Sequence, residues 1–234
     1  MRLLLITLFS FVTLQASTWQ NLDSNNQSSS ILSSQDSNLN QTVLEYQLDG
    51  FHLIPVDTPN GEMHIVKLEK GASILEEGAP DLQKFAKSIV VPDDKQMSAI
   101  VINSDYVEYE NILLAPSKGN LNRSINPNDI EFNFGSQYET DAFYPGELVG
   151  LEDPYILRDL RGQSVVFYPI QYNPIKQTLR VYSNIEVEVR AVGPGLVNVL
   201  NRTSLSPVYS KEFIDIYENH FLNYQNDNRF DYLE

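Results

Sequence analysis

The sequence predicts a mainly β protein, an antiparallel sandwich or barrel, followed by one C-terminal α-helix. Leu179–Val189 alternates strictly between apolar and polar residues, which is typical of an antiparallel strand with one wet face. Tyrosine (13) and phenylalanine (11) are plentiful, and aromatic residues favour strands. Near the C-terminus, apolar residues recur instead at helical spacing. A chain of 234 residues with this pattern is expected to form one main domain.

The surface charge limits the class of partner. The chain has 31 acidic and 16 basic side chains, and its formal net charge is −15. Such a surface repels phosphate backbones, so nucleic acid is excluded as an expected partner. A basic partner, or one that recognises arginine and lysine, fits this charge better.

Residues that carry common catalytic and metal-binding chemistry are scarce. The sequence contains no cysteine, which excludes disulfides and a thiol nucleophile, and no G-x-S-x-G or H-E-x-x-H motif. His52, His64 and His220 lack metal-ligand spacing. The acidic turns Pro92–Asp94 and Leu151–Pro154 lack the pattern of a calcium loop and are expected to be solvated. We therefore expect no catalytic residue, cofactor or metal site in this chain.

The N-terminus has the layout of a secretory signal peptide. Arg2 precedes an apolar run from Leu3 to Leu14, and Ala16 marks the expected cleavage site. Residues 17–42 are rich in Ser, Asn and Gln and show no helical or strand period, so they predict a disordered leader. After removal of residues 1–16 no association with the membrane is expected.

Strand signals begin at residue 43. Val43–Val56 and Met63–Leu68 are predicted strands, and Asp57–Glu62 is the turn between them. Gly71–Pro80 is a predicted loop. Further strands are expected at Ser88–Val91, Ala99–Ile102, Tyr106–Leu114 and Val165–Tyr168, and Tyr172–Gln177 is the turn before Leu179–Val189.

Two aromatic groups lie in the second half of the chain. The rings of Phe132–Tyr144 are interpreted as a cover for one end of the core, with a carbohydrate platform as the alternative. Ser206-Pro207 is a favourable helix start, and it predicts a helix from about Pro207 to Tyr224. Its apolar stripe is Phe213, Ile216, Tyr217, Phe221 and Tyr224.

Two arginines lie in segments that are expected to be exposed. Ile112–Pro127 is a strand end that runs into a polar loop, and Arg123 lies near the middle of this loop. From these residues alone, a solvated arginine is the favoured interpretation; the alternative is a side chain presented to another protein. Arg229 ends a polar segment after the helix, of the kind that proteases cut. By contrast, Arg158, Asp159 and Arg161 are expected to form a structural salt-bridge cluster beside a turn at Gly162.

Several blocks of sequence from about Gly71 onward resemble the propeptide of the gingipain family of secreted cysteine peptidases, most closely the arginine-specific members. These blocks are G-A-P-D-L at 78–82, N-I-L-L-A-P-S-K-G at 111–119, R-S-I-N-P-N-D-I at 123–130, F-Y-P-G-E at 143–147, D-P-Y-I-L-R-D-L-R-G-Q at 153–163, P-I-Q-Y-N-P-I-K-Q-T-L-R-V-Y at 169–182 and I-Y-E-N-H-F-L-N-Y at 216–224.

The resemblance implies a zymogen. In this family a β-sandwich-like propeptide assists folding of the peptidase and blocks its active site, and a loop arginine occupies the specificity pocket. On this sequence the matching residue is Arg123, and the matching processing site is Arg229. The implied organisation is a signal peptide (1–16), a leader (17–42), a β prodomain (43–203), a helix and processing linker (204–229), and the first residues of a peptidase domain (230–234).

The implied partner is therefore a cognate arginine-specific cysteine peptidase domain. The chain by itself is expected to be inactive, and its precursor is expected to be exported by the Sec route to the periplasm and then to the cell surface or medium by the type IX route. The chain ends at Glu234 without a terminating element, so a longer precursor is expected. The alternative functions are a stand-alone secreted β module that binds through its aromatic segment, and a trans-acting peptidase inhibitor.

Overall fold

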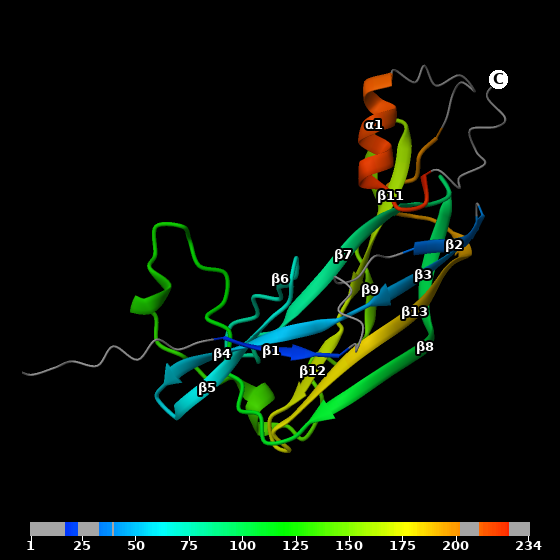
Figure 1. Ribbon diagram of the computed structural model, residues 1–234. Coiled ribbons are helices and arrows are strands. Elements are labelled where there is room, and N and C mark those ends of the chain that lie inside the picture. The colour runs from blue at the N-terminus through cyan, green and yellow to red at the C-terminus, as the bar shows by residue number, and fades with distance from the viewer. Residues whose placement is uncertain (1–16, 23–32, 39, 202–210, 225–234) are drawn as a thin grey trace, which may run out of the picture.

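The computed structural model describes residues 17–22, 33–38, 40–201 and 211–224 of the 234-residue chain (Figure 1). The predicted signal peptide, the helix start at Ser206, the processing site at Arg229 and residues 230–234 lie outside these ranges. Within the described ranges, no helix combines the length and apolar character needed to cross a membrane.

The strands of the described part form three antiparallel sheets. The small sheet has the order β1 (Thr18–Asn21), β4 (Gly50–Thr58), β5 (Gly61–Lys67). The second sheet has the order β10 (Tyr155–Leu157), β11 (Leu160–Phe167), β7 (Gln83–Val90), β6 (Ala72–Ser73), and β9 (Val149–Leu151) also pairs with β11. The third sheet has the order β12 (Ile170–Asn173), β13 (Thr178–Pro194), β3 (Gln41–Gln47), β2 (Ser33–Asn38), and β8 (Lys95–Tyr109) also pairs with β13.

Strand β13 confirms the predicted alternation and organises the third sheet. Five apolar side chains of this strand are fully buried: Leu179, Val181, Ile185, Val187 and Val189. Most of the polar residues between them are partly exposed. Tyr182 is the exception to the predicted wet face, because it is buried and its ring lies 5.3 Å from that of Tyr106.

The main core lies between the second and third sheets. It combines Leu44 and Tyr46 of β3 with Val165 and Phe167 of β11. The rings of Tyr46 and Phe167 stack with centroids 5.6 Å apart, so the two sheets are in direct contact through their inner faces. This arrangement confirms the antiparallel β pairing that the alternation predicted and the sandwich that the family resemblance implied.

The first predicted strand is divided between two sheets. Val43–Val56 is predicted as one strand, but the chain leaves β3 at Gln47 and enters β4 at Gly50. Only the second part forms the expected hairpin with β5, and its turn is tighter than predicted, because Thr58 already pairs with Gly61. The break falls at Leu48-Asp49, the two residues between these strands.

The segment 17–42 differs from the expected disordered leader at two places. Residues 18–21 form β1, where Trp19 pairs with His52 and packs on its ring at a centroid distance of 4.8 Å. Residues 33–38 form β2, which pairs with β3. Neither strand has a hydrophobic period; pairing defines them, with a distant partner for β1 and with the strand that follows directly for β2.

Helix α1 (Lys211–His220) packs over the end of the second sheet (Figure 1). Tyr217 and Phe221 are buried in a second apolar cluster with Val90 and Leu160. The prediction placed Ile216 in the same stripe and was wrong, because this side chain is 46% exposed. Tyr217, which the predicted stripe also includes, lies about 100° further around the helix and is fully buried.

Candidate functional site

A long loop leaves the body of the protein at Ser117 and returns at Gly135, and its base is closed by main-chain hydrogen bonds. Ser117 N donates to Ala79 O (2.7 Å), Gly78 N donates to Ser117 O (3.0 Å) and Gly135 N donates to Gly78 O (2.9 Å). Figure 1 shows this green loop standing away from the sheets. We name residues 118–134 the projecting loop; both of its ends are fixed on one short segment around Gly78.

Two glycines at the base are required by geometry. Gly78 has φ +81°, and a Cβ atom there would lie 3.1 Å from the backbone of Gly135. Gly119 has φ +78°, and a Cβ atom there would lie 3.0 Å from the side chain of Glu77. Both positions combine a left-handed backbone with a close approach, which only glycine accommodates without strain.

Lys118 joins the two arms of the projecting loop. Its ammonium donates a hydrogen bond to Pro127 O at 2.8 Å and lies 4.0 Å from the centre of the Phe132 ring. A cation over an aromatic face is an attractive contact even at a partly exposed site. The contact therefore restrains the far arm of the loop relative to the near arm.

Asn126 caps the short 3-10 helix η1 (Pro127–Asp129). Its side-chain oxygen accepts a hydrogen bond from Asn128 N at 3.1 Å, and Pro127 occupies the first position of the helix. The second 3-10 helix, η2 (Ser136–Glu139), follows the base of the loop. The cap and the fixed φ of Pro127 limit the conformational freedom of this segment.

Arg123 lies at an exposed turn of the projecting loop. Ile125 N donates to Asn122 O at 2.9 Å, which makes Arg123 and Ser124 the central residues of a turn. Arg123 is exposed, and within the described residues its guanidinium has no hydrogen bond or ion pair. A buried or internally paired Arg123 would have excluded the presentation of this side chain to a partner; the observed geometry leaves it available.

The predicted cluster of Arg158, Asp159 and Arg161 is only partly correct. Arg158 Nε lies 3.3 Å from Asp159 Oδ2, and the turn is at these two residues, where Arg158 has φ +53°. Gly162 is inside strand β11 and not at the turn. Among the described residues Arg161 forms no ion pair with Asp159, because its guanidinium is used by main-chain carbonyls of other segments.

Arg161 instead is a buried structural arginine, 2% exposed. Its guanidinium donates to four main-chain carbonyls: Pro92 (2.8 Å), Lys95 (2.7 Å), Val197 (3.0 Å) and Asn198 (2.9 Å). Burial lowers the pKa of Arg161, and the nearby carboxylates of Asp93 and Asp94 oppose this shift. The side chain thus fastens residues 195–198 to the connection between β7 and β8.

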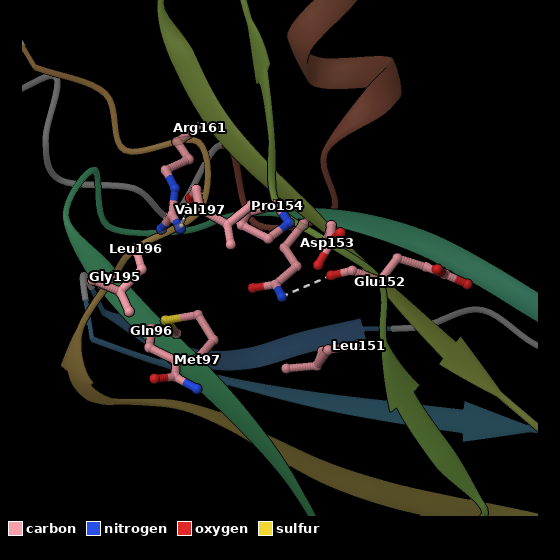
Figure 2. Close-up of a pocket in the computed structure, with 11 residues that line it drawn as sticks. Gln96, Met97, Leu151, Glu152, Asp153, Pro154, Arg161, Gly195, Leu196 and Val197 are labelled. Atoms are coloured by element: carbon pink, nitrogen blue, oxygen red, sulfur yellow. Dashed lines mark hydrogen bonds between the residues drawn. The ribbon is translucent and has the colours of Figure 1, made fainter.

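A cavity of about 320 Å³ lies next to Arg161 (Figure 2). Its wall includes Met97, Leu151 and Val197, and Figure 2 shows Arg161 beside Val197 at its edge. In the described part of the chain, no group of His, Cys, Asp and Glu side chains is arranged to hold a metal ion. The histidines lie on β4, β5 and α1, and the acidic turns form no such group either.

The rings of the aromatic segment contact their own protein. Tyr138 Oη donates to Leu114 O at 2.9 Å, and Tyr144 Oη donates to Glu76 at 2.7 Å. Phe143 lies under the guanidinium of Arg180 at 3.8 Å. Burial is the main cause that raises the pKa of Tyr138 and Tyr144. These contacts favour the interpretation of the segment as a cover for one end of the core over a carbohydrate platform.

Sequence reasoning identified Arg123 but missed the residues that fix the base and the two arms of the loop. Lys118 and Phe132 are 14 positions apart, so no periodicity relates them, and the base at Gly78 is farther still. The local signals are the pairs Asn122/Ser124 and Asn126/Asn128, each two residues apart, because asparagine side chains often accept from the main chain two residues on.

Comparisons with known proteins agree with this architecture. A family described as Propeptide_C25 matches residues 19–226. Gingipain R1 of Porphyromonas gingivalis is 36% identical over 184 residues, and Lys-gingipain of the same species is 24% identical over 190 residues. These alignments cover 79% and 75% of this chain but 18% and 11% of those proteins, so the chain spans less than a fifth of either relative.

Two solved structures share the fold. The complex of the pro- and mature domains of Porphyromonas gingivalis RgpB superposes with a TM-score of 0.77 at 34% identity, over 83% of this chain and 97% of that one. A structure that addresses the zymogenic latency of gingipain K gives 0.64 at 22% identity, over 76% and 100%. Family match, curated relatives and fold agree, and the chain belongs to the Propeptide_C25 family, whose curated relatives are gingipains.

Proposed function

We propose that this chain is the prodomain of an arginine-specific gingipain-like cysteine peptidase, and that it keeps the peptidase inactive by placing Arg123 in the specificity pocket. The observation that carries the proposal is the exposed guanidinium of Arg123 on a loop with a fixed base. The similarity to RgpB, which was solved as a complex of pro- and mature domains, supplies the class of partner.

The chemistry of arginine supports this role. A guanidinium presents five donors in a rigid fork, and a carboxylate accepts two of them side by side. A pocket that selects arginine substrates therefore binds Arg123 through the same contacts. The hydrogen bonds at the base of the projecting loop and the contact of Lys118 with Pro127 O already restrain the loop. Less conformational entropy is therefore lost when the loop binds.

The covalent link to the peptidase sets the strength of inhibition. While the two domains are joined, the effective concentration of the prodomain is on the order of millimolar, so modest affinity suffices. Cleavage after Arg229 removes the link, and inhibition then depends on intrinsic affinity and dilution. In the same proposal, the signal segment 1–16 directs export, the prodomain assists folding of the peptidase, and the type IX route completes secretion.

The test is inhibition of the mature domain of RgpB by the full chain. We expect Arg123→Ala to weaken inhibition by about 30-fold or more, because a central arginine is a typical hot spot of an interface. Arg123→Lys should fall between the two, because an ammonium does not form the paired contacts. Arg190→Ala is the matched control, since this arginine lies on β13 and its side chain is 52% exposed.

Two results would reject parts of the proposal. Equal inhibition by the wild type and Arg123→Ala would remove Arg123 from the mechanism, and no inhibition by the wild type would reject the inhibitor itself. Intact mass of the chain after incubation with the peptidase tests the processing site, because a cut after Arg229 must disappear in Arg229→Ala.

A further inference from the structure

We propose that Leu75 is a second contact with the peptidase, in which a left-handed backbone beside the base of the projecting loop holds an apolar side chain outward for an apolar depression on the peptidase surface. This inference rests on the proposed function, because it takes the partner to be the peptidase domain that receives Arg123. It adds an interaction surface to that function, since the proposed mechanism relies on the projecting loop alone.

The backbone conformation of Leu75 is unusual for an apolar residue. Its φ angle is +62°, in the left-handed region that glycine and asparagine adopt most readily. A leucine is strained there, because its Cβ atom lies too close to the following carbonyl oxygen. Among the described residues, the other non-glycine residues with positive φ carry polar or charged side chains: Lys70, Asn111, Arg158, Gln177 and Asn198.

The side chain of Leu75 stays outside the core. Leu75 is 45% exposed, whereas its neighbour Ile74 packs against the main core. A single exposed leucine is ordinary on a protein surface. At Leu75, however, the exposed apolar side chain coincides with a strained main chain that asparagine or glycine would relieve. A contact of the side chain with a partner accounts for both features.

Contacts on both sides of Leu75 impose this conformation. Ile74 N donates to Leu82 O at 3.0 Å. On the other side, the carboxylate of Glu76 accepts from Tyr144 Oη at 2.7 Å. Strained residues persist where the surrounding structure fixes them, and here the residue before and the residue after Leu75 are both fixed. The main chain at Leu75 is therefore ordered before a partner binds, which lowers the entropy cost of binding.

The position of Leu75 places it next to the base of the projecting loop. Leu75 lies three residues before Gly78, whose N–H donates to Ser117 O at 3.0 Å. Glu77 is in close contact with Gly119, at the start of the loop. Figure 1 shows β6, which directly precedes this segment, on the side of the second sheet that carries the loop. A peptidase domain that covers the loop down to its base therefore meets Leu75.

The expected contribution of Leu75 is smaller than that of Arg123. Leucine is under-represented among the residues that dominate interfaces, whereas arginine is enriched. In addition, Leu75 can gain only from the part of its surface that is still exposed. Apolar burial carries no charge, so salt should screen the contribution of Arg123 but not that of Leu75.

Inhibition of the mature domain of RgpB by the full chain tests this contact. For Leu75→Asn we expect inhibition about five- to tenfold weaker, because apolar burial is lost. Its melting temperature should equal that of the wild type or exceed it by up to about 4 °C, because asparagine tolerates the left-handed backbone. Leu75→Met keeps an apolar side chain and should inhibit within about twofold of the wild type. A purely structural Leu75 would instead give a lower melting temperature for Leu75→Asn, which would contradict the inference.

Ile156→Asn is the matched control. Ile156 is also 45% exposed, but it lies on β10, at the opposite edge of the second sheet from β6. We expect this variant to inhibit within about twofold of the wild type. A loss equal to that of Leu75→Asn would show that any exposed apolar residue has this effect, and it would overturn the inference.

The double variant Leu75→Asn/Arg123→Ala separates a direct contact from an effect on the loop. Independent contacts add in free energy, so the double variant should inhibit about five- to tenfold less than Arg123→Ala alone. If Leu75 acted only by positioning Arg123, its replacement would have no further effect once Arg123 is removed. That outcome would reject the direct contact.

The same measurements distinguish this inference from the proposed function. If Arg123→Ala loses inhibition while Leu75→Asn inhibits like the wild type, the proposed function stands and the contact of Leu75 is rejected. If Arg123→Ala inhibits like the wild type while Leu75→Asn is weaker, the role of Arg123 fails and the contact of Leu75 stands. Absence of inhibition by the wild type rejects both.

Discussion

Asn223 pairs with both main-chain polar groups of Val90, in the manner of a neighbouring strand. Its Oδ1 accepts from Val90 N at 2.7 Å, and its Nδ2 donates to Val90 O at 3.0 Å and to Thr42 Oγ1 at 3.0 Å. Asn223 is 3% exposed and lies three residues after the end of α1. One side chain thus fastens the C-terminal helix to β7 and β3, close to the segment in which processing is proposed.

Asn223→Ala should loosen α1. Loss of these hydrogen bonds in a buried site is expected to lower the free energy of local opening by about 2 kcal/mol, which speeds amide hydrogen exchange in α1 about 30-fold. Hydrogen exchange followed by mass spectrometry measures this. Asn219→Ala is the control, because Asn219 is exposed and donates only to Asp215 O of its own helix. Equal exchange in both variants would show that Asn223 does not hold the helix.

Lys118→Met should weaken inhibition without unfolding the protein. The change removes the hydrogen bond to Pro127 O and the contact with the Phe132 ring, so the projecting loop must be ordered on binding. We expect about fivefold weaker inhibition, equivalent to about 1 kcal/mol. Titration against the mature peptidase domain measures this, with Lys87→Met on the exposed part of β7 as control. Unchanged inhibition would mean that Lys118 does not prepare the loop.

Arg161→Met should destabilise the whole fold. The change leaves four carbonyl groups, from two segments, without their shared donor, and we expect a loss of about 3–5 kcal/mol in the free energy of unfolding. Arg161→Lys should recover only part of this, because an ammonium cannot span four acceptors. Urea denaturation gives the values, and the surface variant Arg190→Met should lose less than about 0.5 kcal/mol. A similar small loss for Arg161→Met would contradict the assignment.

Asp81 should make stability depend on pH in an unusual direction. Burial raises the pKa of Asp81 from 3.8 to about 6. The folded protein therefore binds this proton more tightly than the unfolded chain, so the contribution of Asp81 to stability falls as pH rises from about 4 to 6. Asp81→Asn removes the penalty and should be about 2–3 kcal/mol more stable than the wild type at pH 7.

The control for Asp81 is the pH dependence of the difference. At pH 3.5 the carboxyl group is mostly protonated in both states, so Asp81→Asn and the wild type should have nearly equal free energies of unfolding. Asp57→Asn removes an exposed carboxylate and is the matched control for the change in charge. A difference between Asp81→Asn and the wild type that stays constant from pH 4 to 7 would show that burial does not shift the pKa of Asp81.

The sequence predicted best where one periodicity extends over many residues. The alternation of β13 identified its buried face, and the helical spacing of Tyr217 and Phe221 identified the buried side of α1. It predicted less well where polar residues interrupt a long strand. Strand β8 runs from Lys95 to Tyr109, but Asn103-Ser104-Asp105 divided it into two shorter predictions, because its edge position leaves much of it exposed.

The sequence alone determined an acidic, cysteine-free β protein with a C-terminal helix, and an arginine on a polar loop, because composition and local periodicity are properties of neighbouring residues. Only the tertiary structure separated Arg161, buried under four carbonyls, from Arg123, which is exposed on a turn. Main-chain carbonyls of distant segments surround the guanidinium of Arg161, whereas none in the described part of the chain bonds to that of Arg123. That difference depends on the pairing of strands far apart in the chain, which no local pattern records.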